Sequence, residues 1–152
     1  MKRLLLSRSI TLVVLLCTLS APLLADELNS DDIIKYRQAT MKALGGHMGA
    51  MSRTVQGKVG FKELMPAHAA AISSLSSAVS GMFPEGSDFG DTDAKEEIWS
   101  KPAEFQSAAD TAAEKAQALE AAVQGGDMAT IGAAFKEVGK SCKGCHDQFR
   151  EE

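Results

Sequence analysis

The residues best suited to chemistry form one short run near the C-terminal end of the sequence, Cys142-Lys143-Gly144-Cys145-His146. Two cysteines three positions apart, followed directly by a histidine, are the attachment motif of c-type haem. Each thiol adds to one vinyl group of the porphyrin, and the adjacent imidazole can then coordinate the iron from one face. The motif predicts one covalently attached haem c, bonded through Cys142 and Cys145, with His146 as an axial iron ligand.

Other interpretations of the two cysteines are weaker. A thioredoxin-like dithiol requires a βαβ setting, which the sequence does not offer. A zinc site requires four ligands, and the other two histidines, His47 and His68, have no paired spacing. A disulfide between residues three apart in a helix would have strained geometry. The remaining alternative is an incidental motif in a structural protein, which would purify without colour.

The motif lies in the last of four segments with helical periodicity. Apolar residues recur at alternating spacings of three and four, which is typical of packed helices. These seams run from Ile34 to Val55, Met65 to Met82, Phe105 to Val123 and Met128 to Phe149. Ser30 and Asp127 suit helix N-caps, and Gly125-Gly126 suits a helix end. No segment alternates for long enough to form a strand. We therefore expect an all-α, antiparallel up-down-up-down four-helix bundle that encloses the haem.

The seams also make predictions about single side chains. Cys142 and Cys145 fall on the core-facing seam of the last segment, so a haem attached there would point into the bundle. His68 lies in the second seam, where a lone histidine is most often a hydrogen-bonded core residue. His47 falls off the first seam, and we expect it to be solvated.

Residues 1–25 have the layout of a secretory signal peptide. Three basic residues precede an apolar run, and the small residue Ala25 stands before the acidic Asp26. A single-pass membrane anchor is the alternative, but the apolar stretch is short for a span. We expect cleavage after Ala25, which leaves residues 26–152 as an exported domain without a membrane anchor.

The charge balance narrows the classes of partner. Residues 1–25 hold three of the 16 Lys and Arg and none of the 20 Asp and Glu, so the mature chain has 13 against 20 and a net charge of −7. Such a chain offers no basic surface for nucleic acid, and it suits a basic redox partner. No activated nucleophile, paired carboxylates or phosphate-binding loop stands out, so we do not expect an enzyme.

Further stretches carry a resemblance to a known family. They are Ile34-Lys35-Tyr36-Arg37-Gln38, Glu97-Ile98-Trp99-Ser100, Gly125-Gly126-Asp127 and His146-Asp147-Gln148-Phe149-Arg150. With a haem motif in the last of four helices, the chain resembles class II cytochromes c, the family of cytochrome c-prime and its low-spin relatives. The resemblance covers essentially the whole mature chain. It implies a periplasmic haem protein of a Gram-negative bacterium. Many relatives form homodimers, which leaves that state open for this chain.

Four residues are candidate haem contacts. Arg37 lies on the apolar face of the first segment, where a charge requires a partner, and a haem propionate is a suitable one. Extension of Arg37 to solvent is the alternative. The resemblance adds Gln38 as a haem neighbour. It also places Lys95 and Glu96 where the loop before the third segment passes the haem edge.

Met41 decides between two functions, because the resemblance places it on the open side of the haem. A side chain that does not bind iron there gives the five-coordinate cytochrome c-prime, which binds nitric oxide or carbon monoxide. A coordinating methionine gives the low-spin type, whose soft thioether raises the reduction potential for electron transfer. Similarity to the methionine-ligated relatives is found at Met41, Gly45, Met48, Gly57 and from Met82 to Ser87, whereas Tyr36-Arg37-Gln38 is frequent in cytochrome c-prime. We predict an electron carrier with a haem ligated by His146 and Met41, and the gas-binding protein is the alternative.

Overall fold

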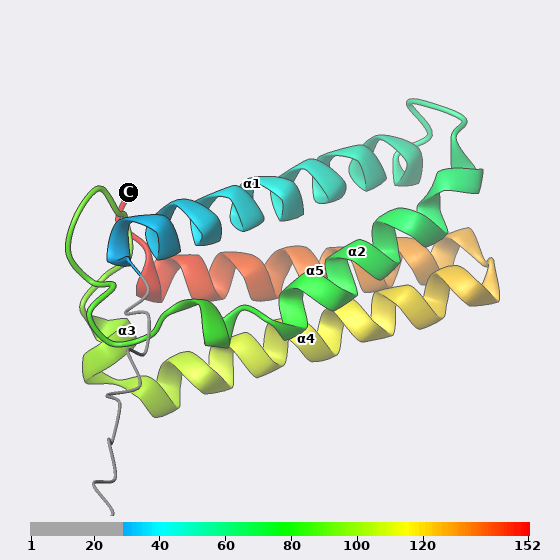
Figure 1. The fold of residues 1–152 in the computed structure, drawn as a ribbon. Helices are drawn as coiled ribbons and strands as arrows, with labels where there is room; N and C mark the ends of the chain where they lie inside the picture. Colours follow the sequence, from blue (N-terminus) through cyan, green and yellow to red (C-terminus); the bar gives the residue numbers. More distant parts are fainter. Residues whose placement is uncertain (1–28) are drawn as a thin grey trace, which may run out of the picture.

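The computed structural model describes residues 29–152, which form four long helices and their connections (Figure 1). The long helices are α1 (Ser30–Val55), α2 (Met65–Ser77), α4 (Pro102–Gly125) and α5 (Met128–Phe149). Short helical turns lie between them: η1 (Lys62–Leu64), η2 (Ser80–Met82) and α3 (Glu97–Ser100). The predicted all-α four-helix bundle is confirmed. The predicted signal peptide lies outside the described residues.

The helix ends follow from local hydrogen bonding. Asn29 rather than Ser30 caps α1, because its side-chain oxygen accepts a hydrogen bond from the N–H of Asp31 at 2.9 Å. Asp127 caps α5 as predicted and accepts from the N–H of Thr130 at 2.8 Å. Gly126 ends α4 with a φ of 75°, a left-handed conformation that glycine adopts without steric cost.

The second helix is shorter than its apolar pattern predicts. It ends at Ser77, and the pattern continues to Met82 through η2, a turn of 3₁₀ helix. The spacing of three residues fits either kind of helix, since 3₁₀ turns also bring residues i and i+3 together. Backbone bonds from Val79 to Ser76 and from Met82 to Val79 close these tighter turns. The apolar pattern therefore predicted burial of Met82 correctly and its secondary structure incorrectly.

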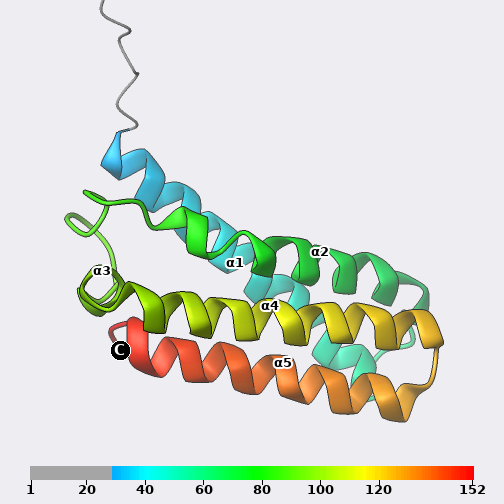
Figure 2. The ribbon, with the colours of Figure 1, turned by 90° about the horizontal axis from the view of Figure 1, so that it is seen from below.

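Each long helix packs against the next one in the sequence, but the first and the last make little contact. Helix α2 packs against α1 and α4, and α4 packs against α5, whereas α1 and α5 touch at only a few points. Figure 2 shows α4 and α5 side by side, with α1 crossing behind them. The start of α1, helix α3 and the C-terminus lie at one end of the bundle, and the turn between α4 and α5 lies at the other. No helix within residues 29–152 is long and apolar enough to cross a membrane.

Two clusters of buried side chains hold the bundle together. The larger consists of Met51, Met65, Ala69, Ile72, Ala116, Leu119, Val123, Ile131 and Val138, and it joins all four long helices. The smaller consists of Ile98, Phe105 and Phe149, and it joins α3, α4 and α5. The cavity described below adjoins both clusters, since Ile72 of the first and all three members of the second line its wall.

Leu119 tests the larger cluster, because its side chain is completely buried there. We expect Leu119→Ala to lower the free energy of unfolding of the haem-loaded protein by about 2–5 kcal/mol, because it leaves a cavity in a close-packed core. Chemical denaturation followed by circular dichroism measures this loss. Leu64→Ala is the matched control. Leu64 is 49% exposed, so the same chemical change should cost less than about 0.5 kcal/mol. Equal losses in the two variants would contradict the assignment of the core.

Candidate haem site

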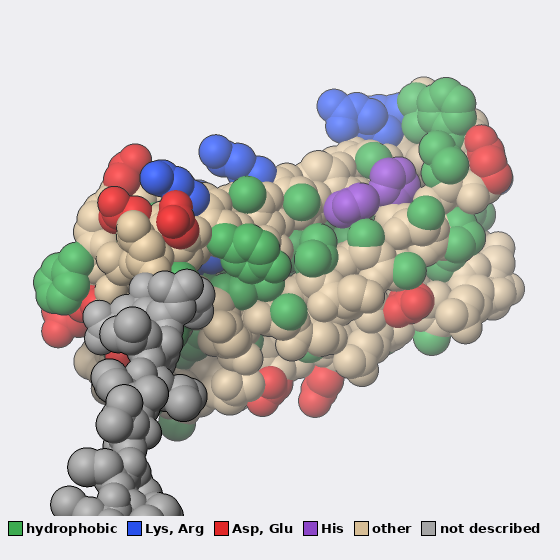
Figure 3. Space-filling view, in the orientation of Figure 1, with side chains coloured by type: hydrophobic (Ala, Val, Ile, Leu, Met, Phe, Trp, Pro, Cys, Tyr) green, Lys and Arg blue, Asp and Glu red, His purple; other side chains and the backbone are tan. Residues whose placement is uncertain are grey.

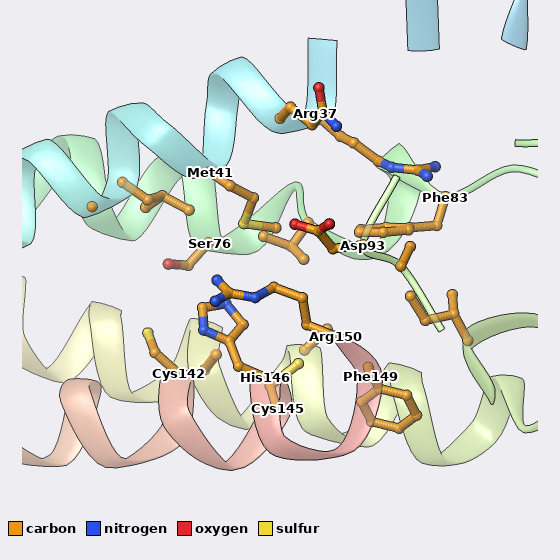
Figure 4. A pocket seen from close by; sticks show the side chains of 18 of the residues that line it. Arg37, Met41, Ser76, Phe83, Asp93, Cys142, Cys145, His146, Phe149 and Arg150 are labelled. Atoms are coloured by element: carbon orange, nitrogen blue, oxygen red, sulfur yellow. The ribbon is translucent and has the colours of Figure 1, made fainter. Parts of the chain in front are cut away.

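Helix α5 presents the two cysteines and the histidine to the space between α5 and α1. Cys142 and Cys145 are three residues apart and therefore share a face of the helix. Both line one cavity together with His146, and Figure 4 shows the three side chains pointing toward α1. Lys143 points the other way: its side chain is 74% exposed and pairs with Asp147 one turn later. The helical geometry thus separates the reactive residues of the motif from its spacer.

The two cysteines are free thiols. Burial in the cavity wall raises the pKa of Cys142 and also that of Cys145. Neutral, unbonded thiols on one helical face are available for thioether bonds to a haem. The disulfide alternative is not adopted. No group of three His, Cys, Asp or Glu within residues 29–152 is placed to hold a metal ion, which leaves the zinc alternative without ligands.

A cavity of about 740 Å³ lies where α1 stands away from α5. Its apolar lining comes from every long helix and from the connection after η2, and consists mainly of Met41, Leu44, Met48, Ile72, Val79, Phe83, Ile98, Phe105 and Phe149. Helix α4 contributes Ala109 and Ala112, whose small side chains leave the space open that larger ones would fill. The cavity is a largely apolar chamber with the attachment residues in one wall.

Arg37 is the only charged side chain buried within residues 29–152, with 3% of its surface exposed. Its Nη1 donates a hydrogen bond to Oγ of Ser87 at 2.8 Å, and its Nη2 donates to Oγ1 of Thr92 at 2.7 Å. Burial lowers the pKa of Arg37, and no carboxylate in the described chain forms an ion pair with it. The negative charge of Asp88 acts against this lowering, but the hydrogen-bond partners of the guanidinium are neutral hydroxyls. A buried cation in a cavity wall with such partners would suit the predicted contact with a haem propionate.

Aromatic rings surround this guanidinium and continue into the helices. The Cζ atom of Arg37 lies 4.8 Å from the ring centroid of Phe83 and 5.7 Å from that of Trp99, within the range of a cation–π interaction. Phe83 also meets the ring of Phe105 edge-on at 5.0 Å, and Phe105 meets Phe149 at 5.3 Å. This chain of rings links the connection after η2 to α3, α4 and α5.

The loop from residue 83 to 96 lines the cavity with Phe83 and with residues 91–94. Gln38 lines the cavity, as the resemblance implied, and donates from Nε2 to the carbonyl of Asp91 at 2.8 Å. Lys95 and Glu96 do not line the cavity, and their predicted place at the haem edge stays a prediction. The N–H of Lys95 donates to the carbonyl of Phe149 at 3.0 Å, and its Nζ lies 3.3 Å from the carbonyl oxygen of Asp147. Lys95 is thus drawn toward the end of α5.

Sequence analysis missed several residues of the site. Ser87 and Thr92, which hold Arg37, lie in a loop without periodicity. Ser76 is buried and lines the cavity from α2, one turn after Ile72 (Figure 4). A step of four residues along the second seam would have found Ser76, but a serine in an apolar seam is easily passed over.

His146 lies beside Arg150, whose side chain reaches back toward the imidazole (Figure 4). Partial burial lowers the pKa of His146, and the positive charge of Arg150 lowers it further. Both effects favour the neutral imidazole, which is the form that binds iron. Across the cavity, Met41 projects from α1 toward the side on which His146 lies.

Comparison with known proteins identifies the family. Residues 32–150 match the protein family described as Cytochrome C′, which covers nearly the whole described chain. The chain belongs to the cytochrome c′ family. The cytochrome c′ of Rubrivivax gelatinosus is 41% identical over 123 residues, 80% of this chain and 95% of that protein. That of Pararhodospirillum photometricum is 40% identical over 119 residues, 78% of this chain and 95% of that protein.

Solved structures of cytochromes c′ have the same fold. The crystal structure of the Rubrivivax gelatinosus protein matches with a TM-score of 0.77 at 39% identity, over 82% of this chain and 98% of that one. A variant of cytochrome c prime from Alcaligenes xylosoxidans, solved as its nitric oxide complex, matches with a TM-score of 0.76 at 32% identity, again over 82% and 98%. The predicted membership of the class II cytochromes c is confirmed.

Membership of this family corrects the predicted function. The main prediction was an electron carrier with a haem ligated by His146 and Met41, and it is wrong. The two relatives named above are cytochromes c′, and a solved relative carries bound nitric oxide, so the comparisons support the five-coordinate, gas-binding alternative. The physical reason for the error is that a methionine in an apolar helical seam serves equally well as a soft ligand and as a flexible filler. Its spacing does not separate the two roles.

The predicted cofactor is confirmed by the family, whose members carry covalently attached haem c. The residues present fit this group. Cys142 and Cys145 would hold it covalently, His146 would bind its iron, and Arg37 would meet its carboxylates. The apolar cavity wall would cover its ring.

The attachment residues can be tested by extraction. We expect a Cys142→Ser/Cys145→Ser double variant to lose all pigment to acid–acetone, because no thioether bond then holds the haem. The Ser141→Ala variant is the control. Ser141 donates to the carbonyl of Val138 and lies next to the motif without entering it, so its pigment should stay with the protein. Pigment retained by the double variant would contradict the covalent assignment.

Two substitutions at Arg37 distinguish the effect of its positive charge from the effect of its hydrogen-bond geometry. We expect Arg37→Ala to lower the free energy of unfolding of the haem-loaded protein by about 1–3 kcal/mol, because buried polar groups lose their partner. It should also lower the reduction potential, because the positive charge that opposes oxidation is lost. Arg37→Lys should keep the potential near its original value while still losing stability, because an ammonium group lacks the planar fork that reaches Ser87 and Thr92.

Denaturant titration and redox titration measure the two quantities. An unchanged potential in Arg37→Ala would place the guanidinium away from the haem.

Proposed function

We propose that this protein is a periplasmic cytochrome c′ that binds nitric oxide or carbon monoxide at a five-coordinate haem. The observation that carries the proposal is the apolar wall opposite His146, where α1 contributes Met41, Leu44 and Met48. The nitric oxide complex of the Alcaligenes xylosoxidans relative supports the choice of ligand. A second structure of that relative, a variant with bound carbon monoxide, has a TM-score of 0.77 at 32% identity.

Residues on the α5 side and on the α1 side of the cavity have different roles in the proposed gas binding. The haem, when bound, supplies an iron atom with one coordination position free for a small gas. His146 would hold the iron from the α5 side, and partial burial and the charge of Arg150 lower its pKa, which favours the neutral imidazole. Met41 covers the other side from α1 as a lid that does not bind iron. An unbranched thioether side chain moves aside easily, so it admits a diatomic molecule.

The apolar wall also selects what enters. A neutral diatomic gas loses little hydration on entering such a space, whereas an anion or a larger polar molecule would be desolvated without compensation. We propose binding without turnover, since no side chain in the wall is arranged as an acid–base pair. The periplasmic location rests on the signal-peptide layout of residues 1–25.

Optical spectroscopy of the purified protein tests this function. We expect a high-spin spectrum when the protein is oxidised and a saturable spectral change when carbon monoxide or nitric oxide is added to the reduced protein. A low-spin spectrum that carbon monoxide leaves unchanged would overturn the proposal.

The role of Met41 as a lid has its own test. We expect Met41→Ala to speed carbon monoxide association at least several-fold without changing the spin state, because removing the side chain opens the apolar side of the cavity. Stopped-flow mixing measures the rate. Met128→Ala is the matched control, since Met128 is a partly buried methionine that packs against the larger cluster and does not line the haem cavity. Equal rates in both variants and the unaltered protein would exclude Met41 as a lid.

A further inference from the structure

Two histidines outside the haem cavity meet between α1 and α2. The Nδ1 atoms of His47 and His68 lie 2.9 Å apart, and their ring centroids are 5.2 Å apart at an interplanar angle of 61°. His47, which the sequence pattern placed in solvent, is instead partly buried against His68. Figure 3 shows histidine side chains gathered as a patch on this face of the molecule.

The pair is separate from the haem site. Leu44 and Met48 turn from α1 into the cavity, whereas His47, which lies between them in the sequence, does not line it. Ile72 lines the cavity from α2, whereas His68 one turn earlier does not. The two rings therefore lie on another side of the α1–α2 pair, and nothing in the proposed gas binding uses them.

The contact between the nitrogens is one that a metal ion can replace. A hydrogen bond between two Nδ1 atoms requires one of them to accept, so at least one ring presents a lone pair. Neutral imidazole nitrogen is the commonest protein ligand of transition metals, and it suits zinc, copper and nickel. A metal ion that takes both nitrogens would exchange one hydrogen bond for two coordinate bonds.

The spacing of the two nitrogens is close to what such an ion requires. Two zinc–nitrogen bonds of about 2.0–2.1 Å at a tetrahedral angle place the nitrogens roughly 3.3 Å apart. The observed 2.9 Å would have to open by only a fraction of an ångström, within reach of small side-chain rotations. The packing of α1 against α2 already holds the two rings together, so metal binding costs little further side-chain entropy.

The surroundings set the character of the site. No third His, Cys, Asp or Glu in the described chain joins the pair, so water must supply the other ligands. Both rings are partly exposed, which gives an ion access from solvent. The mature chain is acidic overall, which raises the local concentration of cations. These features describe an exchangeable site rather than a closed structural one.

We propose that His47 and His68 form a surface site that binds one divalent transition-metal ion of the zinc class through two imidazoles and water. The site bridges α1 and α2, so an ion bound there fastens these two helices to each other. This proposal does not rest on gas binding.

Calorimetric titration of the oxidised, haem-loaded protein with Zn²⁺ in a buffer that does not chelate metals tests the site. His146 is committed to the haem, so these two are the remaining histidines of the chain. We expect one Zn²⁺ per chain. His47→Gln and His68→Gln should each weaken binding at least about tenfold, since even the loss of an outer-shell partner typically costs 10–100-fold. The double variant should show no saturable Zn²⁺ binding, because neither imidazole of the pair remains.

Control measurements distinguish zinc binding at the two histidines from zinc binding at surface carboxylates. Glu114→Gln, which removes an exposed carboxylate of α4, should keep the original affinity. The haem absorption spectrum of each variant reports whether the bundle has formed. Zn²⁺ should raise the thermal midpoint of the unaltered protein, because a ligand that binds only the folded chain stabilises it. It should not raise the midpoint of the double variant.

A measurement on the unaltered protein makes the test independent of the variants. Bound Zn²⁺ should protect His47 and His68 from acylation by diethylpyrocarbonate, read by peptide mass spectrometry. Zinc binding that survives in the double variant, absence of saturable binding, or unprotected histidines would each overturn the proposal.

Discussion

One buried guanidinium connects the irregular part of this chain to its helices. The loop from residue 83 to 96 has no repeating apolar pattern that would dock it, yet Phe83 and residues 91–94 line the cavity. Arg37 joins it to α1 through the hydroxyls of Ser87 and Thr92 and through the rings beside it. Burying a charge is costly unless its hydrogen-bonding groups are satisfied. Two charge-assisted hydrogen bonds and two aromatic rings offset part of that cost, and a carboxylate of the cofactor would offset more.

The long helices contribute both to a packed core and to the wall of the open cavity. Along the apolar face of α1, Ile34 and Met51 are buried, whereas Met41, Leu44 and Met48 between them line the cavity. The same heptad pattern thus serves two purposes on one helix. At the end near the turn between α4 and α5, the helices close on a packed core. Toward the other end, alanines on α4 and the separation of α1 from α5 provide room for a large planar group.

The periodic parts of the structure were predictable and the rest was not. Helix α5, its Asp127 cap and the inward-facing cysteines follow from spacing and capping chemistry, because these are local properties of the chain. Family resemblance was needed to place Gln38. The backbone bond from Lys95 to Phe149 could not be predicted, because it pairs segments that lie far apart in the sequence. The contact between His47 and His68 depends on the register of two helices, which no single seam encodes.

The pairing of the loop with the chain after α5 has a consequence for how this molecule opens. The N–H of Lys95 donates to the carbonyl of Phe149, and the N–H of Glu151 donates to the carbonyl of Asp93 at 2.8 Å. These bonds connect α5, which carries His146, and the residues after it directly to the loop whose hydroxyls bind Arg37. Segments joined in this way tend to unfold locally as one cooperative unit rather than separately. The amide protons of Lys95 and Glu151 would then exchange with solvent in the same fluctuation.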